Sequence, residues 1–150
     1  MTLPSILVVA VTVVFLIWER VCPGRELPDA KGWYWRALLV NLVQLGITLA
    51  TARVWIRLFP VSVFDLAAWE TPIAEGLVGW FVGTFFFYWW HVVRHRPGFW
   101  LLFHQIHHSP ARIEVATSFY KHPIEILSDS VLSALVLYPL LGCSMMGAFW

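Results

Sequence analysis

The histidines of this chain are its clearest candidates for chemistry. All six occur in one segment of the 150 residues, at His91, His95, His104, His107, His108 and His122. Side chains three or four positions apart share one face of a helix, with Cβ atoms about 5–6 Å apart. His91 and His95 can therefore bind one metal ion together, and His104 can do the same with His107 or His108. The spacing predicts a metal site whose ligands are neutral imidazole nitrogens.

The adjacent pair His107 and His108 bears on the number of metal ions. Neighbouring residues on a helix point about 100° apart, because one turn takes about 3.6 residues. The two rings are expected to face different points, which suits a site with two metals better than a site with one. Imidazole binds zinc, copper, iron and nickel alike, so the spacing leaves the metal open. Two alternatives also stay open: axial ligation of a haem, and histidines that only form hydrogen bonds at a membrane surface.

His122 stands immediately before Pro123, and two interpretations of it are open. It can act as a sixth metal ligand. It can instead cap a helix that begins at Pro123, since proline is favoured at the first helical position. Glu125 and Asp129, in the first turns of that helix, are expected to complement its dipole. Glu114, in the preceding connection, is expected to be a solvated loop charge.

The composition predicts an all-α integral membrane protein with a single domain over residues 1–150. Hydrophobic residues make up 59% of the chain and charged residues 13%, against a usual charged share of about 25%. The net charge of +1, with no run of basic residues, argues against a nucleic-acid partner. Cys22 and Cys143 lie far apart and support neither a disulfide framework nor a cysteine metal site.

Apolar segments predict three to four transmembrane helices, with short interfacial helices carrying the histidines. The expected spans are Leu3–Trp18, Ala37–Trp55, Gly76–Val93 and Pro123–Leu141. An interfacial helix is expected at Phe99–His108. Glycines recur at helical spacing in the third span and should let another helix approach closely: Gly76, Gly79 and Gly83. After Leu141, the chain is expected either to turn back at 142–144 or to continue as one long span to Trp150.

The basic residues predict the orientation in the membrane. Eight of the ten fall in two loops: Arg20, Arg25, Lys31, Arg36, Arg94, Arg96, Arg112 and Lys121. An odd number of expected spans precedes each loop, one before the first and three before the second, so both loops lie on one side, and positively charged loops favour the cytoplasm. The histidine cluster is therefore expected on the cytoplasmic side, with the N-terminus outside.

The histidine region, residues 88–125, resembles a known family. The run YWWHVVRHRPGFWLLFHQIHHS, followed by YKHPIE, is similar to the fatty acid hydroxylase and sterol desaturase superfamily. The resemblance implies a membrane-bound, non-haem di-iron oxygenase that uses two iron ions and dioxygen to hydroxylate or desaturate a lipid, of sterol or fatty acyl type. It implies electrons from a reductase, cytochrome or ferredoxin partner. It also implies metal ligation by the five histidines of the first two boxes, with His122 as a further ligand or a donor to one.

One departure from the family pattern gives a second hypothesis. The family carries a third histidine box after another membrane hairpin, and only an apolar run follows His122 here. The expectation is therefore a chain truncated before the third box. The alternative to the oxygenase is an inactive fragment, or a membrane protein that binds a metal or haem without catalysis.

Overall fold

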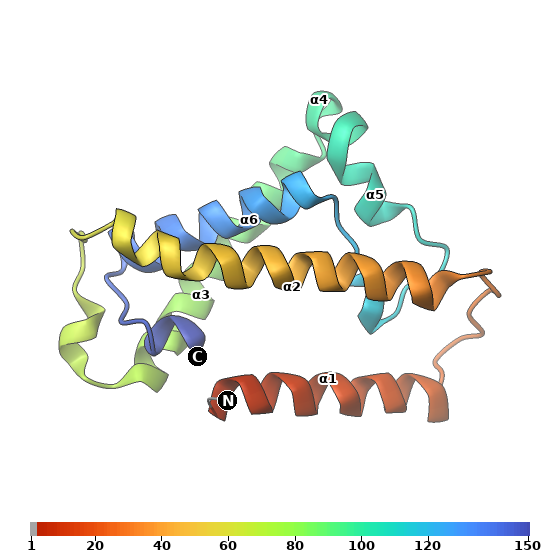
Figure 1. Ribbon diagram of the computed structural model, residues 1–150, viewed down its shortest axis with the longest axis horizontal. Coiled ribbons are helices and arrows are strands. Elements are labelled where there is room, and N and C mark those ends of the chain that lie inside the picture. The colour runs from red at the N-terminus through yellow and green to blue at the C-terminus, as the bar shows by residue number, and fades with distance from the viewer. Residues whose placement is uncertain (1–2) are drawn as a thin grey trace.

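The computed structural model describes residues 3–150, apart from the side chains of residues 52, 53 and 56. Every regular element in that part of the chain is helical (Figure 1), which confirms the predicted all-α class. The elements are α1 (Leu3–Val21), α2 (Trp33–Leu58), η1 (Leu66–Trp69), α3 (Pro72–Arg94), α4 (Pro97–Phe99), η2 (Trp100–His104), α5 (Gln105–His108), η3 (Val115–Thr117), α6 (Pro123–Leu135), η4 (Val136–Leu140) and η5 (Gly147–Phe149).

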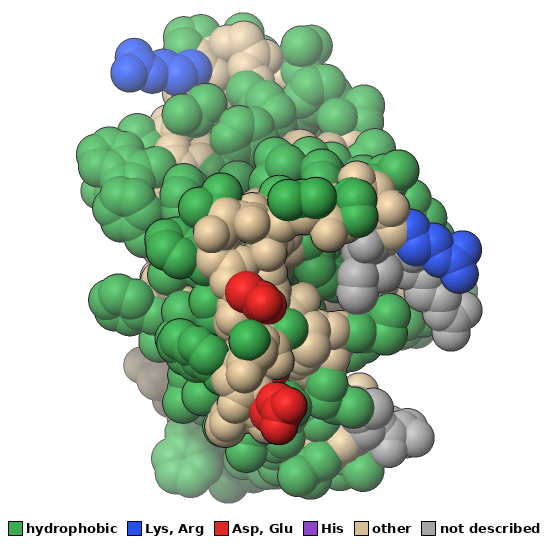
Figure 2. Space-filling model, turned by 90° about the vertical axis from the view of Figure 1, so that its left-hand side faces the viewer, with side chains coloured by type: hydrophobic (Ala, Val, Ile, Leu, Met, Phe, Trp, Pro, Cys, Tyr) green, Lys and Arg blue, Asp and Glu red, His purple; other side chains and the backbone are tan. Residues whose placement is uncertain are grey.

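Several of these helices are suited to a membrane. Within the described residues, three segments are long and apolar enough to cross one: Leu3–Val21, Pro72–Arg94 and Pro123–Leu140. Their hydrophobic side chains are mostly exposed, and hydrophobic side chains predominate on the face shown in Figure 2. A helix with an apolar surface is stable when lipid replaces water around it. The chain is an integral membrane protein, as predicted; that α2 is also a span stays a prediction.

The long helix α2 lies beside α6 (Figure 1), although the residues that join them are 75 and 79 positions apart in sequence. Ser130 of α6 joins the two helices, because its hydroxyl lies 2.8 Å from Thr51 Oγ1 and accepts a hydrogen bond from Trp55 Nε1 at 2.8 Å. Interhelical hydrogen bonds of this kind stabilise helix packing where lipid surrounds the pair.

The chain turns back at Gly142, as in the first of the two predicted alternatives. Gly142 has a φ of +64°, and a Cβ there would collide with the carbonyl oxygen of Phe64. The peptide N–H groups of Phe64 and Ala67 donate to the carbonyls of Leu140 and Gly142 at 3.0 Å each. The returning segment η5 then packs against α3.

The connection between α5 and α6 folds back onto α1 and α2. Glu114, expected to be a solvated charge, has a fully buried side chain, so that prediction is wrong. It accepts hydrogen bonds from Trp33 Nε1 and from Arg112 Nε, the latter at 3.0 Å, and forms an ion pair with Arg20 at 3.0 Å. The Arg20 and Arg112 guanidinium groups lie 5.3 and 5.4 Å from the Tyr34 ring centroid. We call these five residues the Glu114 junction.

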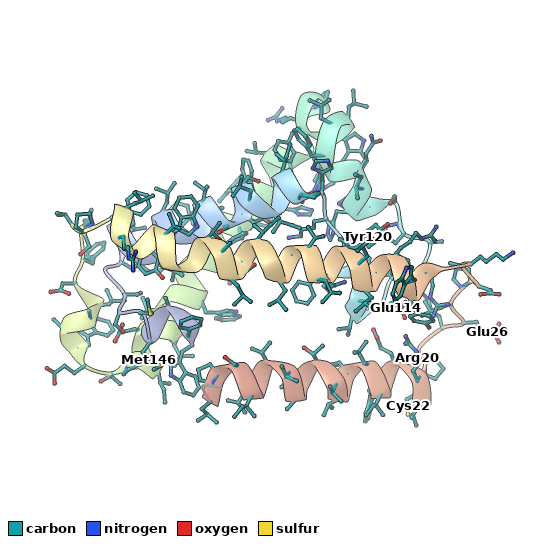
Figure 3. All side chains as sticks on the ribbon, in the orientation of Figure 1. Arg20, Cys22, Glu26, Glu114, Tyr120 and Met146 are labelled. Atoms are coloured by element: carbon teal, nitrogen blue, oxygen red, sulfur yellow. The ribbon has the colours of Figure 1, made fainter. Side chains whose placement is uncertain are left out.

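Figure 3 shows Arg20 and Glu114 close together where α1 ends and α2 begins. The junction brings the two basic loops of the sequence into contact, because Arg112 also donates to the carbonyl oxygen of Pro28 at 2.8 Å. That both loops lie on one side of a membrane stays a prediction. A local sequence pattern could not reveal this burial, since the partners of Glu114 come from distant segments.

The charge of Glu114 is stabilised in the folded state. Burial raises the pKa of its carboxyl, but hydrogen bonds from Arg112 and Trp33 and the charges of Arg112 and Arg20 outweigh burial and leave the pKa below its ordinary value of 4.5. A depressed folded-state pKa adds stability above the unfolded-state pKa, and that stability is lost as the pH falls through the folded value.

We expect Glu114→Gln to lower the free energy of unfolding by about 2–3 kcal/mol at pH 7, because it removes a buried charge that two arginines and a tryptophan contact. The loss should shrink as the pH falls below about 4.5, where the carboxyl of the unfolded chain begins to bind a proton, and should vanish below the lower folded-state pKa. Thermal unfolding in detergent at pH 7 and pH 4 measures both effects. Glu26→Gln, at an exposed position in the adjoining loop, is the matched control; an equal effect of the two substitutions would contradict the prediction.

Candidate metal centre

A sharp reversal of the chain after α3 creates the site. His91 lies in the last turn of α3, and His95 directly follows that helix. Arg96 is extended, with φ −68° and ψ 143°, as expected for a residue before proline. Pro97 then begins a continuous helical segment through α4, η2 and α5. This segment returns beside the end of α3 and brings the second group of histidines against the first.

The returning segment is not a uniform α-helix. Its middle part, η2, is a π-helical turn that ends at His104. Such turns are rare and occur mostly at functional sites. His104 is completely buried, with 0% of its surface exposed. The predicted helix at Phe99–His108 is thus present, with a local change in winding at its central histidine.

Four histidines converge on one point. His91 Nε2 and His95 Nε2 lie 3.0 Å apart, and His104 Nε2 and His108 Nε2 lie 3.1 Å apart. The potential ligand atoms of all four lie within 4.8 Å of one another. We call this group the four-histidine cluster.

The cluster fits a metal ion after a small contraction. Two imidazole nitrogens bound at about 2.0–2.1 Å from a first-row metal ion can be separated by at most about 4.2 Å. The two short pairs already satisfy this limit, and the widest separation in the cluster exceeds it only slightly. Four neutral nitrogen donors suit iron, zinc or copper, so the donor set is compatible with iron without selecting it.

The remaining two histidines lie outside the cluster. His107 Nδ1 lies 3.3 Å from the Tyr120 carbonyl oxygen, which fits an Nδ1–H donor and leaves the Nε2 lone pair for a metal. His122 Nδ1 accepts the peptide N–H of Ile124 at 3.2 Å and caps α6. His107 and His108 therefore face different partners, as expected from their adjacency. Metal ligation by His107 and His122 stays a prediction.

A buried ion pair supports the cluster. Glu125 has 0% exposure, and its Oε1 lies 2.8 Å from His104 Nδ1 and 2.5 Å from Arg94 NH1. Donation from His104 Nδ1–H to this carboxylate directs the Nε2 lone pair into the cluster, in the manner of carboxylate–histidine pairs that hold metals. Arg94 NH2 lies 3.3 Å from His91 Nδ1. Since arginine only donates, metal ligation by His91 Nε2 requires that this contact opens.

Arg94 and Glu125 are the site residues that sequence reasoning misplaced. Arg94 was expected among the loop cations, but only 3% of its surface is exposed. Glu125 does lie in the first turn of α6, yet its carboxylate contacts His104 and Arg94 instead of solvent. Asp129 likewise pairs with Arg94 at 3.2 Å and with Lys121 at 2.8 Å. Two sequence positions could have indicated these roles. Arg94 stands three residues after His91, and Glu125 stands three residues after His122.

Desolvation keeps the imidazoles of His104 and His108 neutral. Desolvation, followed by the positive charge of Arg94, lowers the pKa of His104 to about 3. Desolvation and the neighbouring His95 lower the pKa of His108 below its ordinary value. Both rings are therefore unprotonated at neutral pH, which is the form of imidazole that binds metals.

The sequence of this chain is similar to those of known proteins. The family model described as fatty acid hydroxylase matches residues 76–150. The chain is 34% identical over 115 residues to methylsterol monooxygenase 2-2 of Arabidopsis thaliana, and 32% identical over 115 residues to methylsterol monooxygenase 2-1 of the same plant. Each match covers 75% of this chain, and 43% and 42% of the two relatives. No solved structure matches the chain.

The chain thus spans less than half the length of the curated relatives it matches. The region that matches the family model begins within α3 and includes all six histidines and the Arg94–Glu125 pair. The predicted family is confirmed: the chain belongs to the fatty acid hydroxylase family, within the fatty acid hydroxylase and sterol desaturase superfamily of oxidoreductases.

Proposed function

We propose that this chain forms part of a membrane-bound, non-haem di-iron oxygenase that hydroxylates a lipid substrate. The observation that carries the proposal is the convergence of four histidine nitrogens at the end of a membrane-spanning helix. Ionisable groups in membrane-spanning helices, such as His91 in the last turn of α3, are costly and usually functional. The relatives are named methylsterol monooxygenases, which favours hydroxylation over desaturation and a sterol over a fatty acyl chain.

The four-histidine cluster would hold one iron ion, and His107 is the nearest histidine for a second. The ring centroid of His107 lies 5.5 Å from that of His104. An alkyl C–H bond has no acidity for a base to exploit, so the bound irons would supply, with dioxygen, the oxidising power that the residues lack. One oxygen atom would enter the C–H bond and the other would leave as water, with two electrons from a reductase, cytochrome or ferredoxin partner and two protons from solvent.

The residues of the chain orient the histidines. Glu125 fixes the ring of His104, and the almost fully buried Arg94 balances the carboxylate charge. Asp129 extends the network to Lys121 and to Trp90, whose indole N–H donates to Asp129 at 2.9 Å. A network in which each buried charge has a partner keeps the histidines in place before metal binds.

The orientation in the membrane is also a proposal, with the four-histidine cluster on the cytoplasmic side and the N-terminus outside. The Glu114 junction supports a common side for both basic loops, since it joins the end of α1 to the segment that follows the cluster. Basic loops favour the cytoplasm.

We expect Glu125→Gln to weaken iron binding about 10–100-fold, because the neutral amide no longer orients His104. Iron retained by the purified protein against increasing chelator concentrations measures the affinity. Glu70→Gln, at an exposed acidic position far from the cluster, should leave the affinity unchanged. Full retention of iron by the Glu125 variant would remove this carboxylate from the site.

We expect iron-loaded wild-type protein in membranes to oxidise a methylsterol when dioxygen and a reductant are supplied. Mass spectrometry should find one atom of ¹⁸O from ¹⁸O₂ in the product. His104→Ala should abolish product formation, because it removes a buried ligand of the cluster. Binding of non-haem iron without any oxygenated lipid would favour the non-catalytic alternative, and so would one haem per chain in place of non-haem iron.

Cysteine labelling tests the orientation. Cys22, at the end of α1 (Figure 3), is exposed, whereas Cys143 is buried. We expect a membrane-impermeant maleimide to label Cys22 only after intact cells are permeabilised, because that loop is proposed to be cytoplasmic. Cys22→Ser controls for reaction at Cys143. Labelling of Cys22 in intact cells would reverse the orientation.

A further inference from the structure

Two histidines of the four-histidine cluster lack the kind of contact that orients His104 through Glu125. Within the described part of the chain, the side chains of His95 and His108 form hydrogen-bond contacts only with other histidines, through Nε2. Both side chains are exposed; His95 directly follows α3, and His108 ends α5. Rotation of an imidazole about its terminal side-chain bond is only weakly restricted. No hydrogen bond at Nδ1 therefore fixes the planes of these two rings.

The indole of Trp100 contacts both of these rings. Its centroid lies 5.2 Å from that of His95, with the planes 25° apart, and 5.2 Å from that of His108, with the planes 42° apart. Its contact with His104 is edge-on, at 5.8 Å and 73°. Aromatic rings at these separations attract each other. One indole thus contacts a histidine from each side of the chain reversal, because His95 follows α3 and His108 belongs to α5.

The π-helical turn explains how Trp100 reaches His108, eight positions later in the sequence. In a regular α-helix, residues at this spacing point about 80° apart, because each residue adds about 100°. The turn η2 begins at Trp100, and the peptide N–H of Gln105 donates to the carbonyl of Trp100. The extra residue in such a turn makes the two positions equivalent to residues seven apart, which point only about 20° apart. Trp100 and His108 therefore share one face of the segment.

We propose that Trp100 is a positioning residue of the four-histidine cluster, which holds the ring planes of His95 and His108 by stacking and so keeps both Nε2 atoms directed into the cluster. Its role in iron binding rests on the proposed function. A ligand ring that is already held in place loses less freedom when it binds a metal. The indole does for these two rings what a hydrogen-bonded partner does for other metal-binding histidines.

Iron affinity tests this role without any need for turnover. Purified full-length protein is loaded with iron(II) under argon and titrated with a chelator. Trp100→Leu should bind iron about tenfold more weakly, as the loss of two aromatic contacts predicts. Trp100→Phe keeps an aromatic ring and should stay within about threefold of the wild type. Trp69→Leu, at an exposed position in η1, is the matched control and should change nothing. Equal affinity of Trp100→Leu and the wild type would overturn the proposal.

A double-mutant cycle separates the orientation of a ligand from a general effect on folding. In a His95→Ala background, one of the two stacked rings is absent, so Trp100→Leu should weaken binding only about threefold further. The ring of His91 contacts other histidines but, among the described residues, not the indole. In a His91→Ala background, Trp100→Leu should therefore keep its full effect of about tenfold. Equal effects in the two backgrounds would show that Trp100 acts through folding and would overturn the proposal.

The wild-type protein provides an independent test should Trp100→Leu fail to fold. Stacked aromatic rings shield each other's protons, so the ring protons of His95 should resonate upfield of their positions in the unfolded protein. Proton NMR of metal-free protein in detergent measures the shift, and the loss of these signals in His95→Ala assigns them. Ring protons of His95 without an upfield shift would overturn the stacking.

Affinity and oxygenation together distinguish this inference from the proposed function. Iron binding that depends on Trp100, without any oxygenated lipid, would support the positioning role and contradict the oxygenase. Oxygenation of a lipid with an iron affinity that Trp100→Leu leaves unchanged would do the reverse.

Discussion

The ion pair between Arg94 and Glu125 is the interaction on which the site depends. It joins α3 to α6 across 31 residues of sequence, and both side chains are almost fully buried. A buried charge without a partner would cost several kcal/mol. The two helices must therefore cross where the carboxylate meets the guanidinium, and His104 must bring its Nδ1 to the same carboxylate. The position of the helical segment formed by η2 and α5 follows from this requirement.

A second buried carboxylate supports the site from its other side. The Glu114 junction fastens the segment after α5 to the ends of α1 and α2. Two carboxylates therefore hold the helical segment formed by η2 and α5. Glu125 lies in the first turn of α6, and Glu114 lies in the connection between α5 and α6. Helices in lipid gain little from hydrophobic association with one another. Charged and hydrogen-bonded contacts near the membrane boundary consequently carry much of the specificity of this fold.

The same glycine pattern serves two purposes along α3. Near its start, the absence of a Cβ lets Trp150 and Leu137 approach the helix backbone. One turn later, at Gly83, it leaves an open groove that continues to His91 and Arg94. The spacing alone cannot distinguish these uses, because it shows which residues share a face but not how far away the facing element lies.

The sequence by itself determined the helical class, the membrane location, the family and the pairing of histidines within each helix. These properties depend on composition and on side chains three or four residues apart, which any helix brings together. The tertiary structure decided that the two histidine pairs meet, that His108 and not His107 completes the cluster, and that Arg94, Glu114 and Glu125 are buried. Those outcomes depend on how helices far apart in the chain cross and pack. Helical periodicity relates residues within one helix and carries no information about which other helix lies against it.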